Sequence, residues 1–301
     1  MVSQVTITAP AKVNLALQVA PLGSDGYHEV RSVYTALDLH DTLVFRGAPR
    51  RTIRVDVLGL QAPLVPRRGR DLAGRAARLL RDHCGRPDLG VAITLTKKVP
   101  VAGGMAGGSA DAAASLRGCN ELWQLGASDD ELVQLARQLG ADVPFALLGG
   151  VAHGSGRGDI LTPWPAKGTL TWVFALAPYG LSTADVFATF DRLPPPKQQP
   201  SLEPLRAALE AGDATAIGAN LSNDLAAAAI ALQPELAQTL DAGRHLPGVL
   251  GAVLSGAGPT CAFLCANEES AQEAAKALAA QPQVCDTKLV KSPAPGVSLV
   301  S

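Results

Sequence analysis

The sequence contains little cysteine. It has five cysteines in 301 residues, an odd number, and no two of them have the CxxC spacing. This argues against a disulfide framework and against a zinc site. We therefore expect buried, reduced thiols in a cytoplasmic protein. The cysteines are Cys84, Cys119, Cys261, Cys265 and Cys285.

An excess of one charge and a long apolar run are also missing. The formal net charge is −1, so the chain has no broad basic field for nucleic acid or anionic lipid, and any anion must be bound locally. Residues 1–20 lack the basic start and long apolar core of a signal peptide, and glycines and Pro259 interrupt the longest weakly apolar stretch, residues 249–266. We expect a small-molecule partner, and neither a nucleic-acid nor a membrane partner.

The hydrophobic residues, 47% of the chain, are enough for one large domain or two medium ones. Asp71 is a typical N-cap for a helix that ends at His83, and Ser128 with Glu131 forms a capping box for a helix that ends at Gly140. Alternation predicts strands, and helical patterns predict further helices. The expected strands are residues 2–19, 32–37, 42–46, 51–57, 91–96, 169–176 and part of 251–264, and the further helices are 109–123, 142–145, 183–192 and two or three before residue 251.

This mixed order of strands and helices indicates the α+β class. The glycine-rich segment 149–158 is expected to be a hinge between two domains, and residues 193–200 a proline-rich loop.

The most informative segment is the run PVAGGMAGGSADAAA at residues 100–114, between an expected strand and an expected helix. Its glycines let backbone N–H groups approach an anion, and the helix N-terminus adds a partial positive charge. The run is not a Walker A element, because Ser109 stands where lysine is needed, and it is not a Rossmann fingerprint, because Gly103 and Gly104 are adjacent. Taken alone, a flexible surface turn is the alternative to a phosphate site.

Three other segments contain candidate residues. Lys12 and Asn14 share one face of an apolar strand, so Lys12 either faces an anion or is a solvated lysine on an edge strand. Asp142 precedes a short helix and is either an N-cap or a carboxylate that deprotonates a hydroxyl. Residues 254–263 form a glycine-rich turn that is either an anion nest or a tight hairpin.

Taken together, the motifs PxKxNL, PxxxGxxGGSxxAA and SGxGPTCAF, in this order, resemble those of the GHMP small-molecule kinases. The resemblance covers nearly the whole chain and implies two domains. Residues 1–158 would be an ATP-binding domain with a fold like ribosomal protein S5 domain 2, and residues 159–301 a ferredoxin-like domain. ATP with Mg²⁺ and the substrate would bind in the cleft between them.

Within this superfamily, the segments DGYHE (25–29), GGMAGGSADAA (103–113) and GADVP (140–144) look like one branch. Its members use ATP to phosphorylate a hydroxyl of a cytidine-diphosphate-linked methylerythritol, on the methylerythritol phosphate route to isoprenoids. The alternatives are another GHMP kinase, such as homoserine kinase, and a nucleotide-binding regulator without activity. DGYHE discriminates against the first alternative, and the presence of both Lys12 and Asp142 argues against the second.

The resemblance also implies residue roles. Asp142 would be the catalytic base, Lys12 would keep it ionised and neutralise developing charge, and Asn14 would position the substrate. Tyr27, His28 and Phe187 would grip the cytosine ring by stacking and edge hydrogen bonds. The central motif usually has a pair of serines, and here alanine takes the second position, which leaves the metal ligands unassigned. The residues expected around the ATP phosphates are Val101, Ala102, Gly103, Gly104, Met105, Ala106, Gly107, Gly108, Ser109, Ala110 and Asp111.

Overall fold

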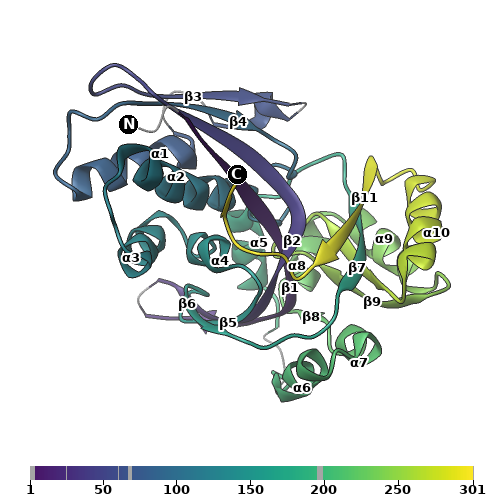
Figure 1. Ribbon diagram of the computed structural model, residues 1–301. Coiled ribbons are helices and arrows are strands. Elements are labelled where there is room, and N and C mark those ends of the chain that lie inside the picture. Colours follow the sequence, from purple (N-terminus) through teal and green to yellow (C-terminus); the bar gives the residue numbers. More distant parts are fainter. Residues whose placement is uncertain (1–3, 25, 60, 67–69, 195–198, 301) are drawn as a thin grey trace.

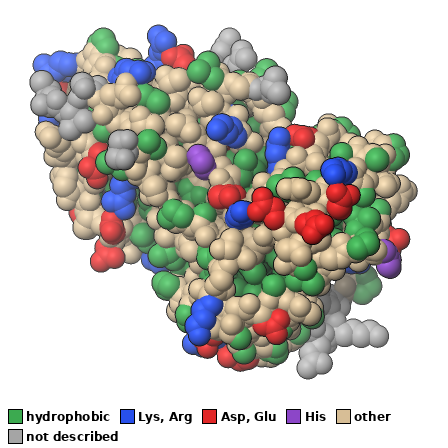
Figure 2. Space-filling view, turned by 45° about the vertical axis from the view of Figure 1, so that its right-hand side comes forward, with side chains coloured by type: hydrophobic (Ala, Val, Ile, Leu, Met, Phe, Trp, Pro, Cys, Tyr) green, Lys and Arg blue, Asp and Glu red, His purple; other side chains and the backbone are tan. Residues whose placement is uncertain are grey.

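The computed structural model describes residues 4–24, 26–59, 61–66, 70–194 and 199–300. Two sheets form the framework, and the long strands β1 and β2 run through the middle of the molecule (Figure 1). Lysine, arginine and acidic side chains are interspersed on the face seen in Figure 2, without a large area of one sign. No helix in the described ranges is long and apolar enough to cross a membrane.

The first sheet has the order β12-β1-β2-β4-β3, with β8 paired to β1 and a β5–β6 hairpin paired to β2. The β1–β2 register shifts between Pro10 and Lys12 and again between Asn14 and Ala16. Such irregularities are common beside active sites, because they change the direction of side chains. They also tolerate a proline within a strand, such as Pro10. The strands are β1 (Gln4–Leu22), β2 (His28–Gly47), β3 (Ile53–Leu58), β4 (Val91–Thr96), β5 (Val151–Ser155), β6 (Ile160–Pro163), β8 (Ser222–Asn223) and β12 (Ser298–Leu299).

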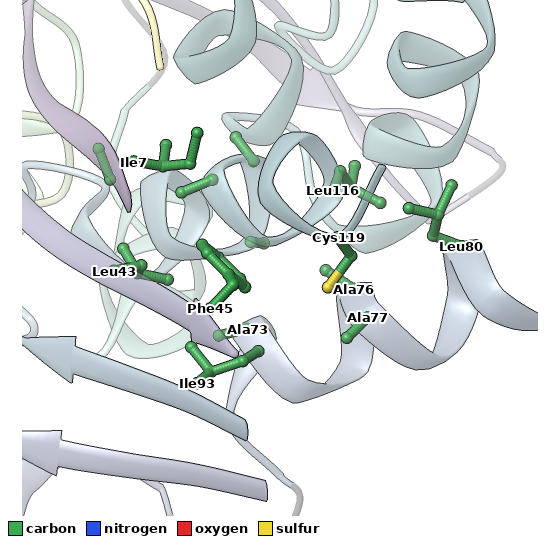
Figure 3. Close-up of a cluster of buried hydrophobic side chains, with 14 of the residues drawn as sticks. Ile7, Leu43, Phe45, Ala73, Ala76, Ala77, Leu80, Ile93, Leu116 and Cys119 are labelled. Atoms are coloured by element: carbon green, nitrogen blue, oxygen red, sulfur yellow. The ribbon is translucent and has the colours of Figure 1, made fainter. Parts of the chain in front are cut away.

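Helices α1 and α2 pack on this sheet through small side chains (Figure 3). Phe45 of β2 lies so close to α2 that a Cβ on Gly118 would fall 2.3 Å from its ring, so only glycine fits there. Small buried residues of α2, namely Ala110, Ala112, Ala113, Ala114 and Gly118, let the helix approach the sheet closely, and the Lys12 N–H of β1 donates to the Met105 carbonyl oxygen just before the helix. The helices of this half are η1 (Ala62–Leu64), α1 (Leu72–His83), α2 (Gly107–Trp123), α3 (Asp129–Leu139) and α4 (Val143–Leu148).

The second sheet is antiparallel, with the order β11-β7-β10-β9. Its strands and helices follow the β-α-β-β-α-β plan of the ferredoxin-like fold, as expected. The elements are β7 (Leu170–Leu176), α5 (Thr183–Phe190), α6 (Glu203–Ala211), α7 (Ala214–Ala219), α8 (Ala226–Leu232), α9 (Glu235–Arg244), β9 (Val249–Leu254), β10 (Cys261–Cys265), α10 (Glu268–Ala279) and β11 (Asp286–Ser292).

The α+β class and the main helices are confirmed. Asp71 accepts a hydrogen bond from the Gly74 N–H, and both bonds of the Ser128–Glu131 capping box are present. Residues 32–37 and 42–46, expected as two strands, are parts of the single strand β2, because β1 pairs along its whole length.

The hinge expected in residues 149–158 is wrong, because β5 occupies its middle and pairs with β2. Gly154 provides room for the Tyr34 ring rather than flexibility, since a Cβ on Gly154 would fall 2.7 Å from that ring. β6, just after residue 158, also belongs to the first sheet, and a domain division at residue 158 stays a prediction. Residues 195–198 of the expected proline-rich loop lie outside the described residues.

Candidate active site

A cavity of about 450 Å³ is lined by residues of both halves of the molecule. Lys12 and Asn14 enter it from β1, Asp142 from the start of α4, and Phe187 from α5. Residues 100–106, called the glycine loop below, and the first turn of α2 form another part of its wall. The structure thus brings together residues from four of the segments that the sequence singled out.

The carbonyl oxygen of Gly104 is the point where the three motifs meet. Lys12 Nζ donates to it over 3.0 Å, and Ser255 Oγ, from the third motif, donates to it over 3.1 Å. Gly104 has a φ of +74°, and a Cβ there would fall 2.0 Å from the Ser255 carbonyl oxygen. Only glycine allows this approach. The turn joins the antiparallel strands β9 and β10 as a hairpin and also contacts Gly104, and an anion nest there stays a prediction.

Lys12 is a buried lysine with neutral bonding partners. Its side chain is 5% exposed, which rules out the solvated edge-strand alternative. Nζ donates to Asn14 Oδ1 over 2.6 Å, and Asn14 Nδ2 donates to Ser32 Oγ over 2.7 Å, so Asn14 is fixed from both sides. Burial lowers the pKa of Lys12 below its usual value, and the charge of Asp142 partly opposes this shift.

Asp142 occupies the N-cap position of α4 without acting as a cap. Within the part of the chain that the structure describes, its side chain makes no capping hydrogen bond, and its φ and ψ are −84° and −10°. The N-cap alternative is therefore wrong, and the carboxylate is left to line the cavity. Tyr34 lines the same wall, and burial together with Asp142 raises the pKa of its hydroxyl, which stays protonated.

Most of the expected loop residues line the cavity, namely Val101, Ala102, Gly103, Gly104, Ala106, Gly107, Gly108 and Ser109. Ala106, with a φ of 57°, precedes α2, whose first turn at Gly107–Ser109 lines the cavity. Met105 and Ala110 are buried in the two hydrophobic cores. The side chains of these two residues are therefore not brought to the cavity, although both were expected around the phosphates.

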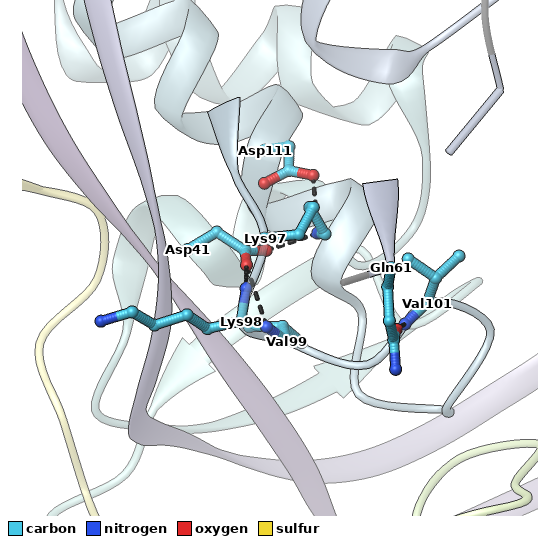
Figure 4. Close-up of polar contacts among 7 residues, drawn as sticks. All are labelled: Asp41, Gln61, Lys97, Lys98, Val99, Val101 and Asp111. Carbon is cyan, nitrogen blue, oxygen red and sulfur yellow. Dashed lines mark hydrogen bonds and ion pairs between the residues drawn. The ribbon is translucent and has the colours of Figure 1, made fainter. Parts of the chain in front are cut away.

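Asp111, also expected there, lines the cavity and belongs to a buried ionic cluster with Lys97 and Asp41 (Figure 4). Lys97 Nζ lies 2.5 Å from Asp41 Oδ2 and 2.9 Å from Asp111 Oδ2. Asp41 Oδ1 accepts the backbone N–H groups of Lys98 and Val99 at 2.5 and 2.9 Å, which fixes the start of the loop.

Two members of this cluster, Asp111 and Lys97, have shifted pKa values. Burial raises the pKa of Asp111 to about 8, although Lys97 opposes the shift. Burial alone would lower the pKa of Lys97, but Asp111 and Asp41 outweigh it and raise the pKa. Sequence reasoning missed this cluster, since nothing in the spacing connects Asp41 with a lysine 56 residues away.

At one end of the cavity, Phe187 packs against His28, with ring centroids 5.0 Å apart. His28 Nδ1 lies 2.8 Å from the Ala20 carbonyl oxygen, and Nε2 lies 3.3 Å from Asp191. Tyr27 is 57% exposed and lies beside Arg157, whose guanidinium is 5.7 Å from its ring centroid and also lines the cavity. Phe187 and His28 are thus brought together, whereas Tyr27 lies at the surface.

The other end of the cavity is mostly apolar, which the sequence did not indicate. Its wall is formed by residues of α1, of β4 and of the segment between η1 and α1, namely Val65, Pro66, Leu72, Ala73 and Leu95, with Arg70 and Asp71 beside them. Among the described residues, no group of three or more His, Cys, Asp or Glu side chains could hold a metal ion.

Comparisons with known proteins agree with this geometry. Residues 71–150 match the family described as "GHMP kinases N terminal domain", and residues 205–283 match "GHMP kinases C terminal". Relatives named 4-diphosphocytidyl-2-C-methyl-D-erythritol kinase are similar along their whole length. That of Thermobifida fusca is 47% identical and covers 99% of both chains, and that of Rhodococcus jostii is 46% identical and covers 99% of this chain and 95% of its own.

Two solved structures resemble this chain in fold to nearly the same degree. A crystal structure of 4-(cytidine 5'-diphospho)-2C-methyl-D-erythritol kinase has a TM-score of 0.78 and 32% identity, covering 95% of this chain and 98% of its own. A homoserine kinase from Cytophaga hutchinsonii has a TM-score of 0.79 and 19% identity, covering 100% and 98%, which shows the fold alone. By sequence and by fold, the chain belongs to the 4-diphosphocytidyl-2-C-methyl-D-erythritol kinase family of the GHMP kinases.

Proposed function

We propose that this protein uses ATP to phosphorylate a hydroxyl of 4-diphosphocytidyl-2-C-methyl-D-erythritol, a step in isoprenoid precursor synthesis by the methylerythritol phosphate route. The observation that carries the proposal is the cavity itself. It is lined by the buried Lys12, by Asp142, whose carboxylate makes no capping bond to α4, and by the glycine-rich N-terminus of α2. This arrangement occurs in a chain whose relatives of that name match it over 99% of its length.

In the reaction, the substrate hydroxyl gives its proton to the Asp142 carboxylate while its oxygen bonds to the γ-phosphorus of ATP. The bond from that phosphorus to the β–γ bridging oxygen breaks, and ADP leaves with the electron pair. The ammonium of Lys12 stabilises the negative oxygens of the transferred phosphoryl group. Because Asn14 and the Gly104 carbonyl already hold this ammonium, little reorganisation is needed during the reaction.

ATP fits the cavity from the glycine loop to the apolar end. The first-turn N–H groups of α2 would bind phosphate oxygens, and the adenine ring would lie among Val65, Leu72 and Leu95. Mg²⁺ is often bound through substrate phosphates and keeps several waters, so it would be held mainly by the phosphates of ATP. When bound, Mg²⁺ would neutralise phosphate charge.

The cytidine would occupy the end of the cavity beside Phe187. We propose that Phe187 supplies a stacking face, that Tyr27 closes the other side, and that His28 reads the polar edge of the base by exchanging its Nε2 contact with Asp191 for the base. Support comes from Phe187 at the cavity wall and from His28, whose ring Phe187 contacts. Asn14 would position the substrate in addition to holding Lys12.

We further propose that the protein acts in the cytoplasm, alone or as copies of itself, and without nucleic acid. Its five cysteines are free, which is typical of proteins in reducing compartments. The division into domains at residue 158 is also proposed, since the two matched family regions lie on either side of it.

Homoserine kinase activity is the alternative, because a homoserine kinase has an equally similar fold. The test is ADP release from ATP with 4-diphosphocytidyl-2-C-methyl-D-erythritol, with the same alcohol phosphate lacking its nucleotide, and with homoserine. We expect rapid turnover of the first substrate alone. Equal turnover of the nucleotide-free alcohol, or faster turnover of homoserine, would contradict the proposal.

A further inference from the structure

Asn223 connects the two sheets at the level of the candidate active site. It lies in β8, which pairs in parallel with β1 and places Asn223 opposite Leu17. Its Nδ2 donates to two carbonyl oxygens, that of Leu254 at 2.8 Å and that of Gly256 at 2.7 Å, while Oδ1 accepts the Leu225 N–H at 2.9 Å. Both amide hydrogens and the amide oxygen are thus engaged, which fixes the side chain.

One carbonyl belongs to Leu254, the last residue of β9, and the other to Gly256 in the turn that follows. β9 is the edge strand of the second sheet, so among the described strands it pairs only with β10, and Asn223 supplies hydrogen bonds at the end of its open edge. The bonded carbonyls flank Ser255, whose hydroxyl donates to the Gly104 carbonyl oxygen. Asn223 therefore holds the segment of the turn that contacts the glycine loop.

The same turn also packs against the Lys12 ammonium. Gly256 has a φ of +54°, and a Cβ there would lie 3.1 Å from Lys12 Nζ and 3.0 Å from the Gly104 carbonyl oxygen. A small shift of the turn would change the packing around the ammonium and the position of the oxygen that Lys12 and Ser255 share. The position of Lys12 thus depends on a turn that Asn223 anchors to β1.

We propose that Asn223 is a positioning residue for phosphoryl transfer, which it serves by holding the 254–258 turn against Lys12 and Gly104. This inference rests on the proposed function, in which Lys12 stabilises the transferred phosphoryl group. Misplacing a catalytic group by about 1 Å costs about 10²-fold in rate, so a positioning role is measurable in kcat.

The test variant is Asn223→Asp, which keeps the size and the acceptor for the Leu225 N–H but places an acceptor against the two carbonyls. The matched control is Asn220→Asp in the turn after α7, where Nδ2 donates to the Ala216 carbonyl over 2.8 Å, away from the 254–258 turn. We expect Asn223→Asp to lower kcat about 10- to 100-fold with little change in either KM, and Asn220→Asp to leave kcat unchanged.

A second readout does not depend on turnover. Acetic anhydride modifies exposed amines, and peptide mass spectrometry gives the rate at each lysine. We expect Lys12 to be acetylated several-fold faster in Asn223→Asp than in wild type, with the buried Lys97 unchanged as an internal control. Asn220→Asp should change neither rate.

The inference is overturned if folded Asn223→Asp keeps kcat within about twofold of wild type, or if kcat falls while Lys12 acetylation stays slow. Should Asn223→Asp fail to fold, Asn223→Ser takes its place, and its hydroxyl can donate to one carbonyl. Loss of about tenfold in kcat is then the supporting result, and wild-type kcat the contradicting one. If wild type itself does not phosphorylate the cytidine substrate, the proposed function fails, and the acetylation comparison still decides whether Asn223 holds Lys12.

Discussion

Lys12 and Lys97 line the same cavity and are both buried, yet their surroundings are opposite. Lys12 donates to neutral oxygens of Asn14 and Gly104, whereas Lys97 lies between the carboxylates of Asp41 and Asp111. Burial lowers the pKa of Lys12, and the two carboxylates raise that of Lys97 despite its burial.

This difference in bonding partners indicates which of the two lysines can interact with a substrate. Neutral partners orient the Lys12 ammonium without cancelling its charge, so the charge can act on a phosphoryl group. The charge of Lys97 is already compensated, and its bonds join the end of β4 to β2 and α2. We infer that Lys12 serves the reaction and that Lys97 holds the glycine loop in place.

The largest effect is expected for Asp142→Asn, which removes the proton acceptor beside Lys12 with little change in volume. Loss of a general base lowers the rate by about 10² to 10⁴, so kcat in an ADP-release assay should fall by this factor, while calorimetry shows ATP binding nearly unchanged. Asp185→Asn, at an exposed position in the first turn of α5, is the control. A variant with more than about half of the wild-type kcat would remove Asp142 from the mechanism.

Phe187→Ala tests whether the end of the cavity beside Phe187 reads a cytidine. Loss of one stacking face costs about 1 to 3 kcal/mol, so KM for the cytidine substrate should rise by about 5- to 150-fold. KM for ATP is the internal control and should stay unchanged, because ATP is proposed to occupy the other end. An equal rise in both KM values would contradict the assignment.

Gly108→Val tests the phosphate site that lies between the two lysines. A Cβ on Gly108 would be 3.5 Å from the nearest atom, a Leu72 methyl, so a side chain fits the protein itself and projects toward the proposed phosphates. Gly107 is less suitable, since its Cβ would fall 2.9 Å from Val99. We expect the ATP dissociation constant to rise about tenfold, equivalent to about 1.4 kcal/mol.

The control for this change is Gly47→Val, at an exposed glycine with open space around its Cβ position. ATP affinity should be unchanged in this control. Wild-type affinity in folded Gly108→Val would indicate that the loop binds something other than ATP.

The smallest effect concerns pH and the Lys97 cluster. Because burial raises the pKa of Asp111 from 3.8 to about 8, the folded protein binds a proton that the unfolded chain has released in this window. The contribution of this group to stability is therefore full below about pH 4 and is lost as the pH rises toward about 8. Asp111→Asn should weaken this decline, by on the order of 1 kcal/mol, in urea unfolding at several pH values. If Asp111→Asn had the same pH dependence of the unfolding free energy as wild type, the raised pKa of Asp111 would be contradicted.

Much of the local structure could be predicted from the sequence, because its causes are local. Asp71, Ser128 and Glu131 form their capping bonds within three residues, and the helices begin where these residues predict. Lys12 and Asp142 could be found only because the order of the motifs resembles that of the GHMP kinases. Taken alone, a lysine on an edge strand and an aspartate at an N-cap are ordinary features.

The remaining site depends on contacts between distant segments. Asp41 and Lys97 are 56 residues apart, and Asn223 reaches a turn 33 residues away, so no spacing indicates either. Met105 was expected at the phosphates because a loop motif gives the order of residues but not the direction of each side chain. The fold decides that direction, since a hydrophobic core lies behind the loop.

The most direct test of the difference between the lysines is a pair of variants, Lys12→Met and Lys97→Met, each measured for kcat and for the free energy of unfolding. Lys12→Met should lower kcat by about 10² to 10³ and leave stability within about 1 kcal/mol, because it removes an electrostatic donor whose partners are neutral. Lys97→Met should lower the unfolding free energy by about 3 to 5 kcal/mol, because the buried Asp41 loses its counter-charge and Asp111 loses its hydrogen-bond partner, with a smaller loss of kcat in the folded fraction. The reverse pattern, with stability lost at Lys12 and turnover lost at Lys97, would contradict the account.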